Sequence, residues 1–285
     1  MKFRVLTTVF ITIFCANDVL AQTKGMQPII DSHVHVKTTA DDYPKPFEEY
    51  LEENKEFNLK YVFGITMADQ GVMDETRARN DSLFSLAKKY PQFVPVCSVH
   101  PYDGHEAILE LDRIVALGGK IIKLHPISQN FEILDQRVTT LVEAAGERNL
   151  IVLMDGFGLV IGDYLEDLLK LVLFNKKTNF IIAHMGGYDF TKLMGHHLVR
   201  RYHPYMFDNL WFDFSATVIM AADSPFQDQL EWIIRTVGTD RVLFGSDDPT
   251  GTLTETMEAF DKYNFTAEER NLILYNNAAK LLRLD

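Results

Sequence analysis

Cysteines and basic residues are both scarce in this sequence of 285 residues. There are only two cysteines, Cys15 and Cys97, which excludes a small fold held together by several disulfides. Cys97 lies in the apolar run FVPVCSV, where we expect a small buried hydrophobe. Lys and Arg number 28 against 40 Asp and Glu, so the formal net charge is −12. No basic patch compensates for this charge, which argues against a surface for nucleic acid or anionic membranes, because phosphates would be repelled.

Long hydrophobic runs are missing as well, except for one short run near the start. Lys2 and Arg4 precede a largely apolar stretch of about a dozen residues, shorter than the ~20 needed to span a bilayer. The residues Val19-Leu20-Ala21 then supply the small or compact side chains that a signal peptidase reads. We therefore expect residues 1–21 to be a signal peptide, with a membrane anchor or a buried first helix as the alternative. The mature protein is then exported, periplasmic or secreted, without stable membrane insertion.

Short β-rich runs alternate with longer amphipathic runs over the rest of the chain. The β-rich runs begin 27 to 33 residues apart, a spacing that matches the ~30 residues of a βαβ unit. The runs between them carry apolar residues at intervals of three and four, which is typical of helices that cover a sheet. The β-rich runs begin near Pro28, Lys60, Phe93, Lys120, Leu150, Asn179, Leu210 and Asp240.

Eight strands that alternate with eight helices predict an α/β fold, a single (β/α)8 TIM barrel. The barrel forms one domain, from about Gln27 to Asp285. An open doubly wound sheet is the alternative. That fold usually has fewer strands and often a glycine-rich phosphate loop after the first strand, and this sequence contains neither GxGxxG nor GxxxxGKS/T.

A barrel of this kind places its active site at the carboxyl ends of its strands, so polar residues there are candidates for function. The first strand ends in DSHVH, and the alternation of a strand puts His33 and His35 on one face. Two imidazoles this close can bind one metal ion together. The sequence therefore predicts a metal site at this strand end, although a short HxH that stands alone is more often structural.

Other strand ends carry further candidates. Lys123 and His125 lie on one face of the fourth strand, Asp155 ends the fifth, His184 the sixth and Asp247 the eighth. The two carboxylates end apolar runs, and a buried charge in such a position needs a metal ion or a charged partner. The concentration of these groups at one rim favours a functional site over scattered structural residues.

These strand ends resemble the amidohydrolase superfamily. DSHVH on the first strand, IKLHP on the fourth, AHMGG on the sixth and LFGSDDP on the eighth are similar to motifs of its amidohydrolase-related branch. That branch contains metal-dependent hydrolases, lactonases and non-oxidative decarboxylases. The resemblance runs from Ile29 to Leu284, where NNAAKLL resembles the closing helix of the branch. It is specific for the family and much less so for the substrate.

The resemblance also implies a set of metal ligands. The first-strand pair maps onto His33 and His35, and the eighth-strand aspartate onto Asp247. The sixth-strand histidine, a ligand of a second metal in some members and a catalytic group in others, maps onto His184. The implied cofactor is a divalent metal ion, zinc or alternatively manganese. Asp155 replaces the usual fifth-strand histidine, and we expect it to ligate the metal, the alternative being a weak or absent metal.

Lys123 leaves several roles open. In binuclear members of the family a fourth-strand lysine is carboxylated and bridges two metals. Here the lysine could instead stay cationic and hold a substrate carboxylate or a developing oxyanion. A purely structural role, as counter-ion of Asp155 or Asp247, is the third possibility.

The hypothesis that follows is a metal-dependent hydrolase of a small carbonyl substrate, namely a lactone, an amide or an ester. In this hypothesis Asp247 takes the proton of the attacking water and His184 stabilises the oxyanion or assists proton transfer. Lys123 or His125 orients the substrate. The alternatives are a non-oxidative decarboxylase on the same barrel and a metal-poor protein that binds a small ligand without catalysis. The expected partner is a small molecule, and a homo-oligomer is left open.

Overall fold

The computed structural model describes residues 27–38, 44–158, 162–203 and 205–284. The signal peptide expected over residues 1–21 lies outside these ranges, so export stays a prediction. Among the helices in the described ranges, none is long and apolar enough to cross a membrane. Cys97 is a buried free thiol, as its apolar surroundings in the sequence indicated.

Eight parallel strands form one sheet whose spatial order follows the sequence. The sheet closes between its first and last strands, where Asp247 N donates to His33 O at 2.9 Å and His35 N donates to Asp248 O at 2.8 Å. The predicted (β/α)8 barrel is thereby confirmed. The strands are β1 (Ile29–His35), β2 (Leu59–Ile65), β3 (Phe93–Ser98), β4 (Ile121–Leu124), β5 (Ile151–Met154), β6 (Asn179–Ile182), β7 (Leu210–Asp213) and β8 (Val242–Leu243).

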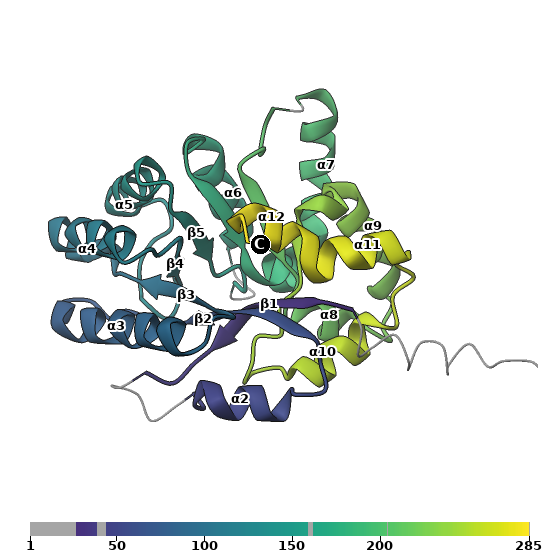
Figure 1. Cartoon of the computed structure of the whole chain (residues 1–285). Helices are drawn as coiled ribbons and strands as arrows, with labels where there is room; N and C mark the ends of the chain where they lie inside the picture. Colours follow the sequence, from purple (N-terminus) through teal and green to yellow (C-terminus); the bar gives the residue numbers. More distant parts are fainter. Residues whose placement is uncertain (1–26, 39–43, 159–161, 204, 285) are drawn as a thin grey trace, which may run out of the picture.

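Helices connect the strands and surround the sheet, with α3 to α6 along one side of the barrel in Figure 1. The α-helices are α2 (Phe47–Glu53), α3 (Met73–Lys89), α4 (His105–Ala116), α5 (Gln136–Glu147), α6 (Tyr164–Phe174), α7 (Leu193–Tyr202), α8 (Thr217–Ala221), α9 (Gln227–Val237), α10 (Leu253–Phe260), α11 (Ala267–Asn271) and α12 (Asn277–Leu282). Segments of 3₁₀ or π type are η1 (Pro101–Asp103), η2 (Ala183–Lys192), η3 (Thr239–Arg241) and η4 (Leu272–Asn276).

The apolar core has two layers. One lies between the strands and the surrounding helices. The other fills the barrel with inward-facing strand residues such as Ile30, Ile151 and Leu243, and it includes residues of α12. Lys120, just before β4, donates a hydrogen bond to the carbonyl of Leu282 at 2.8 Å. The last helix therefore lies against the amino-terminal end of the barrel (Figure 1), which leaves the opposite end for the polar residues.

The first strand is irregular where it carries its histidines. Its pairing with β2 shifts register between Asp31 and Val34. Because of this irregularity, Ile30 and His33 both face the barrel interior although they are three residues apart, while Val34 packs into the outer layer. The shift brings His33 into the centre of the barrel mouth.

Candidate active site

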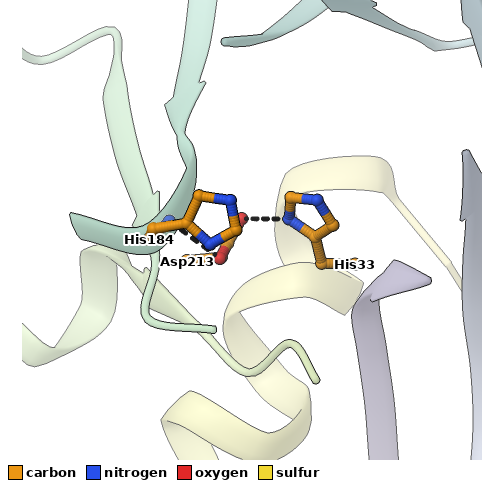
Figure 2. A group of neighbouring side chains, drawn as sticks. All are labelled: His33, His184 and Asp213. Atoms are coloured by element: carbon orange, nitrogen blue, oxygen red, sulfur yellow. Dashed lines mark hydrogen bonds and ion pairs between the residues drawn. The ribbon is translucent and has the colours of Figure 1, made fainter. Parts of the chain in front are cut away.

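His33 lies at the centre of a polar cluster, fully buried at the carboxyl end of β1. Its Nδ1 is 3.0 Å from Oδ2 of Asp213, which ends β7. Figure 2 shows the Asp213 carboxylate between the rings of His33 and His184. When a carboxylate accepts the Nδ1 proton of a histidine, the lone pair of the ring lies on Nε2. The contact therefore directs a ligand atom of His33 away from Asp213, toward the interior of the site.

The Nε2 atom of His33 faces the side chain of Asp247. Oδ1 of Asp247 is 3.5 Å from Nε2 of His33 and 3.4 Å from Nε2 of His35. Candidate ligand atoms of these three residues all lie within 4.8 Å of one another. Two imidazoles and a carboxylate are a donor set that zinc and manganese accept. The residues that hold the barrel seam together thus also form a group able to bind a divalent metal.

The protonation states of His33 and Asp247 favour the binding of a cation between them. Burial, followed by the charge of Lys123, lowers the pKa of His33 to about 4. Burial alone would raise the pKa of Asp247, but contacts with the histidines lower this pKa below its ordinary value. A neutral imidazole nitrogen and a carboxylate oxygen that face each other are both electron-rich, so a positive charge between them is stabilising. The donor set therefore fits a divalent metal ion.

Lys123 on β4 is a fixed cation next to this group. Its side chain has no exposed surface, and Nζ lies 3.3 Å from Nε2 of His33 and 3.4 Å from Oδ2 of Asp155. A lysine is almost never fully buried without a charged partner. The geometry places its ammonium between the metal-competent group and the carboxylate that ends β5.

Asp155 receives contacts from three side chains. Its Oδ2 lies 3.2 Å from Nε2 of His184, 3.4 Å from Nζ of Lys123 and 3.6 Å from Nε2 of His125. Burial would raise the pKa of Asp155, but the charges of Lys123 and His184 hold it well below the usual range. Its Oδ1 accepts a hydrogen bond from the backbone of Phe157 at 2.9 Å. Asp155 is therefore an anion fixed among the cationic groups of the site.

His184 is turned into the site by an unusual backbone. Ile181 and Ala183 face the barrel interior, so a regular continuation of β6 would point His184 outward. Instead His184 has φ 58° and ψ 16°, in the left-handed region that few non-glycine residues adopt. Its amide donates to Asp213 at 3.1 Å, and its carbonyl accepts from Thr217 at 2.5 Å. Both bonds hold the turn that aims the ring at Asp155.

The contacts of His184 keep it protonated. Burial would lower its pKa, but the adjacent Asp155 carboxylate raises the pKa of His184 to about 9. Nδ1 of the ring lies 2.9 Å from Oγ of Ser215 and 3.2 Å from its carbonyl oxygen. An imidazolium donates from both nitrogens, and it finds acceptors at both: Ser215 at Nδ1 and Oδ2 of Asp155 at Nε2. His184 is thus a proton donor at neutral pH, next to an ionised Asp155.

The structure brings all seven candidate residues to one end of the barrel, but it divides them into two sets. His33, His35 and Asp247 form the group with mutual ligand distances. The other set is Asp155 with His125, Lys123 and His184, whose nitrogen atoms surround Oδ2 of Asp155. A second group with ligand distances combines His33 and His184 with Asp213. Asp155 belongs to neither group, so its expected role as a metal ligand stays a prediction.

Two further strand-end residues were missed in the sequence. Asp213 and Ser215 follow the apolar run LWF at the seventh strand, and a carboxylate that ends such a run is the signal by which Asp155 and Asp247 were selected. Ser215 donates a short hydrogen bond to Asp213. Asp213 therefore contacts both His33 and His184 and fixes the orientation of His33.

Another buried carboxyl group, that of Asp31, holds the backbone near His33 through hydrogen bonds. Asp31 accepts hydrogen bonds from Tyr50 Oη at 2.8 Å and from the amide of Ser246 at 2.9 Å. Burial raises the pKa of Asp31 to about 7. Asp248 is buried as well, and its Oδ2 lies 3.1 Å from Nζ of Lys45. Both carboxyl groups hold the seam of the barrel rather than its catalytic face.

Comparison with known proteins gives the family. The amidohydrolase family model matches residues 30–284. The chain belongs to the amidohydrolase family. Among curated proteins, no match is found. The resemblance of the strand-end motifs to this family is thereby confirmed.

Solved structures show the same barrel at low sequence identity. An uncharacterised TIM-barrel protein from Bordetella bronchiseptica has a TM-score of 0.70 and 19% identity, covering 90% of this chain and 98% of its own. A probable 2-pyrone-4,6-dicarboxylic acid hydrolase from Acinetobacter baumannii has a TM-score of 0.63 and 17% identity, with coverage of 90% and 99%. A 5-carboxyvanillate decarboxylase from Novosphingobium aromaticivorans, with bound manganese, has a TM-score of 0.65 and 17% identity, covering 90% and 97%. At this identity the likeness shows the fold alone.

Family membership and geometry agree on the kind of site. The amidohydrolase match supports an enzyme, and the His and Asp groups at the barrel mouth suggest a divalent metal. Both a hydrolase and a decarboxylase occur among structures of this fold. The choice between these reactions depends on what the side chains of this chain can do.

Proposed function

We propose that this protein is a metal-dependent hydrolase of a small carbonyl substrate, namely a lactone, an ester or an amide, and that the metal is zinc or alternatively manganese. One observation carries the proposal. The ionised carboxylate of Asp247 lies 3.5 Å and 3.4 Å from the Nε2 atoms of His33 and His35, across the site from the cationic groups around Asp155. A base and a set of cations that face one another suit the addition of water to a carbonyl group.

His33, His35 and Asp247 would hold the metal. When bound there, a divalent cation supplies Lewis acidity, which polarises a carbonyl oxygen and makes water a better nucleophile. Asp213 keeps the Nε2 lone pair of His33 available by accepting the proton of Nδ1. Asp155 contributes negative charge near the metal, as an additional ligand or as the partner of Lys123.

The remaining side chains move protons and stabilise charge. Asp247 is ionised near neutral pH, the form in which a general base accepts the proton of the attacking water. Lys123 lies close enough to stabilise the oxygen that becomes negative as water adds to the carbonyl carbon. His184 is protonated and can deliver a proton to the leaving oxygen or nitrogen when the acyl bond breaks. His125 lines the partly exposed side of the site and would orient the substrate.

Decarboxylation is the second candidate, because the same protonated His184 could supply the proton that replaces the departing carboxyl group. One experiment separates the two reactions. The purified protein is first analysed for bound metals, and is then assayed against lactones, esters, amides and aromatic carboxylic acids with acid release and carbon dioxide release measured in parallel.

We expect stoichiometric metal and acid release from at least one lactone, ester or amide, with loss of turnover in H35A. Carbon dioxide release without hydrolysis would establish the decarboxylase instead. A protein with neither activity and no bound metal would be the binding protein considered from the sequence.

A further inference from the structure

One glutamine side chain joins three of the loops at the carboxyl end of the barrel. Gln129 lies in the loop after β4 and is buried. Its Nε2 donates to the carbonyl of Ala68, after β2, at 2.8 Å and to the carbonyl of Val99, after β3, at 3.1 Å. Its Oε1 accepts from the amide of His125, directly after β4, at 2.8 Å. Both donors and the acceptor of this side chain therefore hold backbone at the ends of three neighbouring strands.

The backbone of Gln129 fixes the same loop. Its amide donates to the carbonyl of His125 at 2.8 Å, and its carbonyl accepts from Nε2 of the buried His100 at 2.6 Å. Nδ1 of His100 accepts in turn from the amide of Tyr102 at 3.1 Å. A buried polar network in which each member has its partners is rigid. The loop that carries His125 is therefore held in one conformation.

This loop determines which ring nitrogen of His125 carries the proton. The amide of Ser128 donates to Nδ1 of His125 at 3.4 Å. A backbone N–H can only donate, so Nδ1 presents a lone pair and the proton of the ring lies on Nε2. Oδ2 of Asp155 is 3.6 Å from this Nε2, beyond hydrogen-bond distance. Within the part of the chain that the structure describes, Nε2 makes no hydrogen bond, which leaves its proton for a ligand.

His125 is also the most accessible member of its set. The side chain of His125 is 19% exposed, whereas Lys123 has no exposed surface and Asp155 and His184 are 5% exposed each. His125 belongs to neither group with metal-ligand distances. Its free donor therefore lies where a substrate can reach it, beside the cations of the site and apart from the metal-competent group.

We propose that His125 donates a hydrogen bond from Nε2 to an oxygen of the bound substrate, and that Gln129 is the positioning residue that holds His125 in this tautomer. This inference rests on the proposed function and assigns His125 to the substrate rather than to the metal. A neutral N–H donor stabilises a carbonyl or carboxylate oxygen without adding a charge to the site. The contact selects carbonyl compounds that present an acceptor oxygen on the exposed side of this set.

Nitrogen NMR of protein labelled in its histidine rings tests the tautomer without requiring turnover. H125Q identifies the signals of His125 by their absence. We expect a protonated Nε2 and an unprotonated Nδ1 at neutral pH, both before and after zinc is added to chelator-treated protein. A bare Nε2 in either state would overturn the inference, because that nitrogen could bind a metal but could not donate. A cationic ring, protonated on both nitrogens, would overturn it as well.

Two substitutions of His125 test the donor with a substrate in hand. H125A removes the donor, whereas the amide of H125Q places an N–H near the position of Nε2. We expect H125A to raise KM by about 3- to 10-fold, the loss typical of one hydrogen bond, with a smaller change in kcat. H125Q should restore KM to within about twofold of the parent protein. Equal losses in the two variants would contradict the donor role.

Q129A tests the positioning role, and Q136A is the matched control at an exposed glutamine of α5. We expect Q129A to populate both neutral tautomers of His125 and to raise KM as H125A does, because the loop loses its three side-chain hydrogen bonds. Q136A should change neither. Q129E keeps the acceptor for the amide of His125 and should retain the Nε2 tautomer more fully. A less stable Q129A with an unchanged tautomer and KM would show that Gln129 is only structural.

Failure of this inference can be told apart from failure of the proposed function. If the NMR signals show the expected tautomer but no lactone, ester or amide is hydrolysed, the tautomer assignment stands and the hydrolase is wrong. If H35A abolishes hydrolysis while H125A leaves KM unchanged, the hydrolase stands and the donor role of His125 is wrong.

Discussion

The chemistry of the site depends first on one carboxylate. Asp247 follows β8, and its Oδ1 lies 3.5 Å from Nε2 of His33 and 3.4 Å from Nε2 of His35. If it is both a metal ligand and the general base, D247N should lower turnover toward the upper end of the about 10²–10⁴-fold range for general acid–base groups, and should reduce bound metal. Steady-state kinetics on a substrate identified by the panel, with metal analysis of the same preparation, measure both effects.

The adjacent aspartate supplies the control. Asp248 is buried and lies 3.1 Å from Nζ of Lys45, and it belongs to neither group with metal-ligand distances. D248N should therefore lower the melting temperature while leaving metal content and most turnover intact. Near-normal activity in D247N, or a greater loss of activity in D248N, would contradict the proposed mechanism.

Asp31 predicts a pH dependence of stability. Burial raises its pKa from 3.8 to about 7, so the folded protein keeps a proton that the unfolded chain releases between about pH 4 and pH 7. The stabilising contribution is complete below pH 4 and is lost as the pH rises to about 7. D31N should make the free energy of unfolding fall less steeply with pH over this interval. The change in slope corresponds to up to about one proton bound on folding. Urea unfolding at several pH values measures the slope, and D228N, at an exposed aspartate of α9, should leave it unchanged.

At the scale of strands and helices, the sequence predicted the order and the type of elements well. Each predicted strand begins within two residues of the observed one, since apolar β-rich runs and turn residues mark strands locally. A capping box precedes α11, in which Thr266 and Glu269 bond reciprocally, and the three-residue spacing of Thr266 and Glu269 in the sequence is typical of such a helix start. The last strand is the exception: β8 comprises only Val242 and Leu243, because β1 bonds to the irregular segment that follows.

The side-chain network of the site was only partly predictable. The position of Lys123, Asp155 and Asp247 at strand ends correctly predicted that they lie at one end of the barrel. It could not foresee that a left-handed turn reorients His184, nor that Tyr50 on α2 reaches Asp31. Contacts of this kind join residues far apart in the chain, and no local pattern encodes them.

The close approach of β5 and β6 supports a prediction about a glycine. A Cβ atom on Gly156 would lie 2.1 Å from the carbonyl oxygen of Ala183, the residue before His184. Backbone must move to relieve this contact, so G156A should cost about 1–3 kcal/mol in the free energy of unfolding and should also reduce turnover. Gly195 on α7 has no atom within 4 Å of such a Cβ. There, G195A should be neutral or stabilise by up to about 1 kcal/mol. Equal unfolding curves for the two variants would show that the strands are not packed this closely.

For the molecule as a whole, the metal-competent group lies on the seam that closes the barrel. His33 and His35 belong to β1, Asp247 follows the short β8, and backbone hydrogen bonds between these segments join the first strand to the last. A cation held by all three side chains would connect the two ends of the sheet where strand pairing is shortest. Metal binding should therefore raise the stability of the entire barrel rather than of one loop.

Thermal unfolding with and without metal tests this coupling. A ligand at 100 times its dissociation constant stabilises the folded state by about 2.7 kcal/mol, which for a chain of this size corresponds to a rise of about 5 °C in the melting temperature. We expect such a rise when zinc or manganese is added to chelator-treated protein, and its reversal by chelator. H35A and D247N should lose most of the rise, whereas H105A, at an exposed histidine at the start of α4, should keep it. A full rise in H35A would mean that the metal binds elsewhere and does not connect β1 to the segment after β8. Retention of the rise in D247N but not in H35A would instead leave the histidine pair as the ligands and confine Asp247 to proton transfer.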